Sequence, residues 1–196
     1  DAAAGTFSLT LEQVLPATPD DPGAIKEAQL IPVAVGLIGA ADGKDIVVDA
    51  AAVVVSDEEG GSGSTATSAT EPGTVILRLN AMKATYTFKC GGGGGAPPVP
   101  SVLRGFSAPV KLEMSPPLST DDLLFVLAND SDPFNRWEAS QILSRGIMTR
   151  TVAKLGAEAA TLGASDVGAA VRADDAFERF VDACRGIIAD ATADAV

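Results

Sequence analysis

The chain has 196 residues, a length that fits one domain or two small ones. Its hydrophobic content is 46% but its aromatic content only 5%, so we expect a core of aliphatic residues and alanine with a few phenylalanine anchors. The net charge is −12, with 13 acidic and 7 basic residues before Ser115 and the same numbers from Ser115 onward, which argues against nucleic-acid and anionic-membrane partners.

The first quarter of the chain predicts β-strands. Residues 5–13 alternate strictly, with Phe7, Leu9 and Leu11 on one face, which is typical of a half-buried strand. Residues 29–37 predict a second strand, and Pro32 places it at a sheet edge or puts the proline at the strand start. An Asp-Gly turn then leads to a third strand over 46–48, which the weaker apolar stretch 50–55 continues.

Two stretches of low complexity interrupt the second quarter. Residues 57–72 are too polar to offset their ordering entropy and predict a mobile loop. Residues 74–79 and 84–88 predict strands that a short connection joins as a hairpin. The five glycines within 91–98 are followed by prolines rather than by a helix, so we interpret them as a flexible linker and not as a phosphate loop.

Residues 98–113 predict the last strand or strand pair, with Pro109 at a bend or an edge. Six or so short strands separated by turns indicate a small immunoglobulin-like β-sandwich. Pro116 and Pro117 then end the β pattern. The expected fold class is therefore all-β followed by all-α, with a sandwich over 1–114 and helices over 115–196.

The helical half carries clear start signals. Ser119 caps a first short helix, and Asp132 caps a second with Pro133 at its first position. Its predicted apolar contacts are Phe134, Trp137, Ile142, Ile147 and Met148, and Gly146 weakens its end. A third helix is expected over 151–162, and a fourth begins near Asp174 or Asp175. Such a series of helices is typical of an α-solenoid or bundle. The apolar stripe of the fourth helix needs a partner helix beyond Val196, so we expect the chain to be a truncated part of a longer protein.

The cysteine and histidine content limits the catalytic mechanisms and metal sites that this chain could contain. Cys90 and Cys184 belong to no CxxC pair, so we expect two thiols in a reducing compartment, with a disulfide as the alternative. The sequence has no histidine, which excludes Ser-His and Cys-His mechanisms and the commonest zinc ligand. We therefore predict no zinc site in this chain.

Acidic clusters are the first candidate sites. Adjacent acids occur at 20–21, 57–59, 121–122 and 174–175, where an acid-base pair or an oxygen-ligand metal site competes with the commoner interpretation, solvated acids and helix caps. Asp130, Ser131 and Asp132 resemble the start of a calcium loop. The sixth position is Asn135 instead of the glycine that the turn requires, so we discount it.

Two arginines are the remaining candidates. Arg136 beside Trp137 suggests a binding platform, but a lone tryptophan on an amphipathic helix is more often a core anchor with the arginine over an interface. Arg104, next to Gly105 and Phe106, is expected to pair with an acid across a domain interface, which is a structural role.

Three groups of residues together resemble one family. They are the segments 99–113 (VPSVLRGFSAPVKLE), 123–139 (LLFVLANDSDPFNRWEA), and the early strand 7–13 with 16–19 and 31–37. These segments are similar to bacterial-type aminopeptidase N, an alanyl aminopeptidase of the zinc gluzincin class. The similarity covers most of the chain outside the two glycine-rich loops.

The resemblance implies a position within a larger enzyme. In that family a β-domain precedes a thermolysin-like catalytic domain, a small β-sandwich comes third and a helical superhelix fourth. This chain matches the third domain and the first helices of the fourth. The family's His-Glu-x-x-His helix, Gly-x-Met-x-Asn strand and catalytic tyrosine are not found in it, and Tyr86 lies in a predicted sandwich strand.

We therefore assign no catalytic, cofactor-binding or metal-binding residue to this chain. The resemblance implies a non-catalytic part of a zinc-dependent metallo-aminopeptidase that removes N-terminal residues from peptides, with zinc in the parent enzyme only. Its partners would be the catalytic domain of the same polypeptide and, through it, peptides, with no nucleic acid and no membrane. We expect the cytoplasm, or an organelle such as a plastid. The alternative is a stand-alone adaptor that binds a protein partner.

Overall fold

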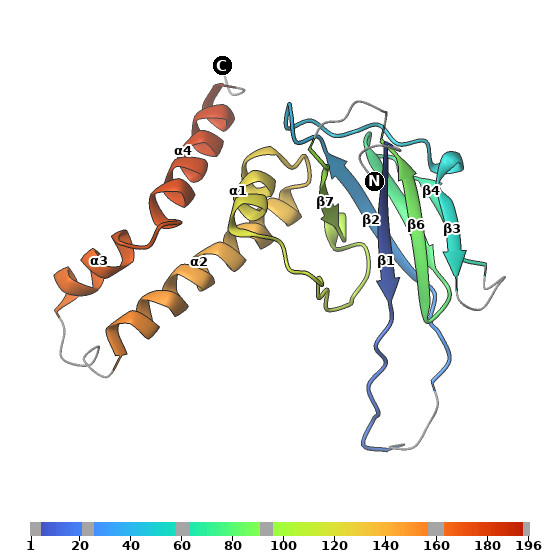
Figure 1. The fold of residues 1–196 in the computed structure, drawn as a ribbon, viewed down its shortest axis with the longest axis horizontal. Coiled ribbons are helices and arrows are strands. Elements are labelled where there is room, and N and C mark those ends of the chain that lie inside the picture. Colours follow the sequence, from blue (N-terminus) through green and yellow to red (C-terminus); the bar gives the residue numbers. More distant parts are fainter. Residues whose placement is uncertain (1–4, 21–25, 58–62, 91–95, 157–162, 194–196) are drawn as a thin grey trace. The chain divides into compact units, whose positions relative to one another are not determined.

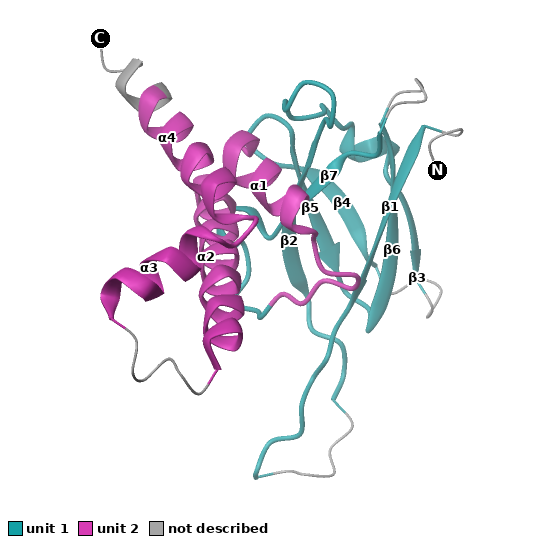
Figure 2. Cartoon of the chain, turned by 60° about the vertical axis from the view of Figure 1, so that its left-hand side comes forward, with its two compact units in different colours: residues 1–111 teal, residues 112–196 magenta. Residues whose placement is uncertain are grey.

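The computed structural model describes residues 5–20, 26–57, 63–90, 96–156 and 163–193. The chain divides into two compact units, residues 1–111 and residues 112–196, shown in teal and magenta in Figure 2. The first unit is built of strands and the second of helices, as Figure 1 shows. The expected fold class, all-β followed by all-α, is confirmed.

Two antiparallel sheets make up the described part of the first unit. One has the order β1-β6-β3 and the other β4-β5-β2-β7. The strands are β1 (Thr6–Glu12), β2 (Ile31–Ile38), β3 (Val54–Asp57), β4 (Thr65–Ser68), β5 (Thr74–Leu79), β6 (Lys83–Lys89) and β7 (Val99–Val102).

The core of the sandwich follows from period-two burial. Val75, Leu77 and Leu79 of β5 are buried at alternate positions, and so are Tyr86 and Phe88 of β6. In β2 the burial is continuous from residue 33 to residue 38, because both faces of the strand are covered: the short turn at Arg104–Phe106 contacts it, and the Arg104 side chain lies over Gly36. The proline of β2 is its second residue, so the strand-start interpretation is right and the edge interpretation is wrong.

One predicted pairing is wrong. The strands at 74–79 and 84–88 exist as β5 and β6, but they belong to different sheets and form no hairpin. β6 pairs with β1 over the whole of β1, from Thr6 opposite Lys89 to Glu12 opposite Lys83. The short segment 80–82 therefore joins the two sheets. A short connection between two alternating strands cannot by itself distinguish these arrangements.

Two further predictions in this unit are corrected. Residues 46–48 form no strand, because only an isolated bridge between Ile38 and Asp45 pairs this region, and β3 begins later. Within the predicted loop 57–72, β4 pairs with β5. Its Thr-Ala-Thr-Ser sequence buries little apolar area, but the pairing depends on backbone hydrogen bonds. Residues 58–62 and the glycines 91–95 lie outside the described residues.

The second unit contains four described helices. They are α1 (Thr120–Asn129), α2 (Pro133–Leu155), α3 (Ala164–Arg172) and α4 (Phe177–Ala193). The predicted caps are confirmed. Ser119 Oγ accepts a hydrogen bond from the Asp122 backbone N–H at 3.1 Å, and Asp132 Oδ2 accepts one from the Asn135 N–H at 2.9 Å.

The boundaries of the middle helices differ from the prediction. α2 continues through Gly146 to Leu155, so the separate helix expected over 151–162 does not exist in the described residues. Gly146 does not end the helix because a helical glycine costs only about 1 kcal/mol relative to alanine. α3 was not predicted. It is short and rich in small residues, and none of its residues is buried.

The buried face of α2 also differs from the prediction. It consists of residues four apart in the sequence: Asn135, Ala139, Leu143, Ile147 and Thr151. Trp137 is 54% exposed, and Ile142 and Met148 are exposed as well, so Trp137 is not a core anchor. Among the described residues, no helix is both long and apolar enough to cross a membrane.

Candidate functional site

Two of the acidic pairs named from the sequence, 121–122 and 174–175, lie at helix starts, whereas Asp57 ends β3 and Asp20 lies in a turn. Asp122 closes a capping box with Ser119, and Asp121 forms an ion pair with Arg179 of α4 at 2.7 Å. Both acids lie at the start of α1, where negative charge is stabilised by the helix dipole. Asp21, Glu58 and Glu59 lie outside the described residues.

Asp174 has the strongest partner among these acids. Its carboxylate accepts two hydrogen bonds from Arg150 of α2, at 2.8 and 2.9 Å, and one from the Ala176 N–H at 3.0 Å. The hydrogen bonds from Arg150 are the main reason why the pKa of Asp174 falls to about 2. This buried carboxylate joins α2 to the start of α4, and it stays ionised at any physiological pH.

The calcium-loop resemblance corresponds to a helix start. Asp130 Oδ1 accepts a hydrogen bond from the Asp132 backbone N–H at 2.9 Å, and Asp132 caps α2. The described residues contain no group of three or more His, Cys, Asp or Glu side chains that could hold a metal ion.

Arg104 is the centre of a buried polar cluster in the sandwich unit. Its Nη1 and Nη2 donate to the two carboxylate oxygens of Asp45 at 3.0 and 2.7 Å. Nε donates to Ser101 Oγ at 2.9 Å, and Nη1 also donates to Thr74 Oγ1 at 3.1 Å. The predicted pairing with an acid is therefore right, but the acid lies in the same unit rather than across a domain interface.

The backbone of β2 makes room for this arginine. A Cβ placed on Gly36 would lie 2.0 Å from Arg104 Cζ, so only glycine allows the guanidinium to lie over the strand. Leu103, which precedes the arginine, has φ 66°, a left-handed conformation uncommon for leucine. Neither Gly36 nor Asp45 is singled out from the sequence, because nothing local marks them as partners of Arg104, which lies 68 and 59 positions further along the chain.

Tyr86 is a core residue of the sandwich. It is fully buried, its hydroxyl donates to the Arg78 carbonyl at 3.0 Å, and burial raises its pKa. Cys90 and Cys184 are both free thiols in the structure.

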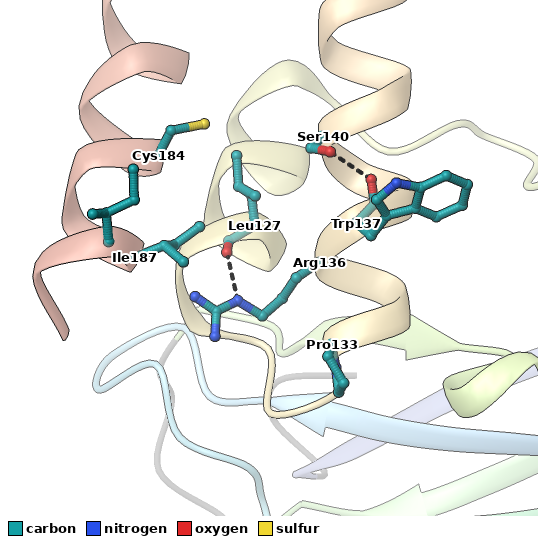
Figure 3. A pocket seen from close by; sticks show the side chains of 8 residues that line it. Leu127, Pro133, Arg136, Trp137, Ser140, Cys184 and Ile187 are labelled. Carbon is teal, nitrogen blue, oxygen red and sulfur yellow. Dashed lines mark hydrogen bonds between the residues drawn. The ribbon is translucent and has the colours of Figure 1, made fainter. Parts of the chain in front are cut away.

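The helical unit contains a pocket of about 400 Å³. Pro133, Arg136, Trp137 and Ser140 of α2 and Leu127 of α1 line one side. Cys184, Ile187 and Ile188 of α4 line the other (Figure 3). Most of this surface is apolar.

Arg136 is the cation of this pocket. Its Nε donates to the Leu127 carbonyl at 3.1 Å, which holds the guanidinium beside α1 (Figure 3). The Trp137 indole points away from α4 and packs on Phe134, with ring centroids 5.8 Å apart. Of the two sequence interpretations, the core anchor is wrong because Trp137 is 54% exposed, and the binding platform stays a prediction.

Known protein families match both halves of the chain. Residues 1–115 match a family described as a domain of unknown function, DUF3458, with an Ig-like fold. Residues 120–196 match DUF3458_C, a domain of unknown function described as ARM repeats.

Aminopeptidase N of Escherichia coli K12 is 30% identical over 148 residues, which are 76% of this chain and 14% of that protein. Aminopeptidase N of Caulobacter vibrioides is 54% identical over 55 residues, which are 28% of this chain and 6% of that protein. The chain thus spans a small part of the relatives it matches.

A solved structure shows the same fold. The crystal structure of Legionella pneumophila aminopeptidase A in complex with aspartic acid has a TM-score of 0.51 and 21% sequence identity. The similarity covers 78% of this chain and 13% of that chain.

Proposed function

Because the chain belongs to the aminopeptidase N family, we propose that it forms a non-catalytic part of a zinc-dependent metallo-aminopeptidase that removes N-terminal amino acids from peptides. The observation that carries this proposal is the 30% identity with Escherichia coli aminopeptidase N over 148 residues, and the two successive domain matches, Ig-like over 1–115 and ARM repeats over 120–196, support it. In our assignment, residues 1–114 are the sandwich and residues 115–196 begin the helical domain.

The sandwich acts as a spacer in this proposal. A spacer between two domains must be rigid. The buried ion pair between Arg104 and Asp45 links the residues that follow β7 to the segment that follows β2. Gln13 forms a second buried group of hydrogen bonds. Its side chain donates to the Gln29 and Ala81 carbonyls and accepts from the Gln29 N–H. Such fully bonded polar groups favour one rigid packing.

The helices begin the domain that encloses the active site of the parent. ARM-type helices stack side by side into curved arrays with large concave surfaces. α1, α2 and α4 pack on one another and leave apolar side chains at the pocket, as an element of a stacked array does.

Zinc does not fit the residues of this chain. The sequence has no histidine, and the described residues hold no cluster that could bind a metal. Zinc would therefore be bound by another part of the parent enzyme, and we derive no catalytic step from this chain. Peptides would likewise meet the chain only through the parent.

We also propose the cytoplasm, or an organelle such as a plastid, as the compartment. The two unpaired thiols support a reducing environment.

The test uses the native polypeptide. An antibody raised against the 196-residue chain is used to purify the natural protein that contains it. Its mass is measured, and hydrolysis of alanyl-p-nitroanilide is followed with and without a zinc chelator. We expect a polypeptide several times longer than 196 residues with chelator-sensitive activity. The recombinant chain, assayed in parallel as the control, should have none.

Two results would contradict the proposal. The first is zinc-dependent turnover by the recombinant chain itself. The second is a native polypeptide of the same size as the chain without peptidase activity, which would support a stand-alone adaptor instead.

A further inference from the structure

The pocket between α1, α2 and α4 combines an apolar lining with a cation whose hydrogen-bonding capacity is only partly used. A guanidinium has five N–H donors, and four of them are on the two Nη atoms. Arg136 uses Nε for the Leu127 carbonyl. Within the described part of the chain, neither Nη atom of Arg136 has a hydrogen bond or an ion pair.

Asp130 and Asp132, which lie between α1 and α2, form no ion pair with Arg136 in the described part of the chain. The Asp132 carboxylate accepts from the Asn135 N–H, and Asp130 Oδ1 accepts from the Asp132 N–H. On the opposite wall, Ile187 and Ile188 are apolar, and Ile188 is 65% exposed. A group that fills this pocket must therefore offer both an aliphatic surface and an acceptor for the fork of Arg136.

A carboxylate is the acceptor that fits best. Arg–carboxylate pairs form two parallel hydrogen bonds, and these are roughly twice as strong as hydrogen bonds between neutral groups. Covering Arg136 with apolar atoms alone would leave a buried cation without a counter-charge, which is strongly unfavourable.

We propose that this pocket binds a protein segment that presents an Asp or Glu carboxylate next to an aliphatic side chain, with the carboxylate on Arg136 and the aliphatic group against Ile187 and Ile188. The segment belongs to the remainder of the aminopeptidase polypeptide. This last assignment rests on the proposed function, whereas the chemistry of the pocket does not.

The overall negative charge of the chain helps to separate a local effect of Arg136 from a general attraction. With a net charge of −12, the chain repels anionic ligands in general. A preference for an acidic peptide over its neutral analogue must therefore come from a local cation. The probes are acetyl-Leu-Glu-Leu-amide and acetyl-Leu-Gln-Leu-amide, which differ only in the central carboxylate.

Cys184 provides the readout because it lines the pocket. In the Cys90→Ser chain it is the only thiol, and a bound peptide should slow its reaction with a thiol reagent. We expect the Glu peptide to protect Cys184 at about a tenfold lower concentration than the Gln peptide, since a hydrogen bond to a charged group contributes about 1.5 kcal/mol or more. Raising the salt concentration should reduce this ratio.

Matched variants identify the cation. Arg136→Gln should remove the preference for the Glu peptide. Arg145→Gln removes an exposed arginine of the same helix that does not line the pocket, and it should keep the preference. The proposal is overturned if neither peptide protects Cys184 in the unmodified pocket, if both protect it equally, or if the preference survives in Arg136→Gln.

These outcomes are separate from those of the proposed function. An active native enzyme together with a failed peptide experiment would remove only the pocket proposal. Peptide binding by a natural protein without peptidase activity would instead remove only the assignment of the segment to an aminopeptidase.

Discussion

Arg104 and Asp45 form a two-pronged ion pair inside the sandwich, with Nη1 and Nη2 at 3.0 and 2.7 Å from the two carboxylate oxygens. The Arg104 side chain is 4% exposed and that of Asp45 is 15% exposed. Two residues 59 positions apart thus neutralise each other's charge in a largely buried site, where either charge without the other would be strongly unfavourable.

Removing the cation should destabilise the sandwich strongly. In Arg104→Gln the Asp45 carboxylate stays partly buried without its counter-charge, and we expect the free energy of unfolding to fall by about 3 kcal/mol. Urea denaturation followed by circular dichroism measures this loss. The control Arg78→Gln changes an exposed arginine of β5 and should cost about 0.5 kcal/mol or less. Equal losses in both variants would show that the buried pair has no special role.

Gly36 should be coupled to the same arginine. In Gly36→Ala the new Cβ would lie 2.0 Å from Arg104 Cζ, so the guanidinium must leave its site. We expect a loss similar to that of Arg104→Gln, and little additional loss when both substitutions are combined. A double-mutant cycle in urea tests this expectation. Fully additive losses would contradict the close approach.

The sequence predicts the structural features that depend on neighbouring residues, but not those that depend on contacts between residues far apart in the chain. The Ser119 and Asp132 caps and the alternation of β1 are local signals, and they identified the elements correctly. The sheet that each of β5 and β6 joins, and the Asp45 partner of Arg104, depend on contacts between distant residues, which no local pattern encodes. The sequence favours a core position for Trp137 because an exposed indole is the less common case, but this side chain is 54% exposed.

The orientation of α2 is tested by two neighbouring residues. Leu143 is 4% exposed and Ile142 is 42% exposed, although both are large aliphatic residues. Leu143→Ala should reduce the free energy of unfolding of the helical unit by about 2–5 kcal/mol because it leaves a cavity. Ile142→Ala should cost about 1 kcal/mol or less, since its side chain is partly in water already. Amide hydrogen exchange in α1 and α2 reports these losses. The reverse order would support the face predicted from the sequence.

Asp174 should make the stability of the helical unit depend on acid pH. Its pKa is about 2 in the folded chain and 3.8 ordinarily, so ionised Asp174 stabilises the folded state above pH 4. This stabilisation is lost as the pH falls from about 4 to about 2, because protonation weakens the hydrogen bonds from Arg150. The shift corresponds to about 2.5 kcal/mol, and we expect about 1–2 kcal/mol because the Arg150 side chain is 47% exposed.

The measurement compares thermal unfolding of the original chain and Asp174→Asn between pH 2 and pH 5. The difference in stability should be largest at pH 5 and should shrink toward pH 2, since the asparagine cannot titrate. Asp175→Asn is the matched control, because Asp175 is exposed and lies next to Asp174. If the stability difference between the original chain and Asp174→Asn does not change with pH, the Arg150–Asp174 pair does not control the acid sensitivity of this unit.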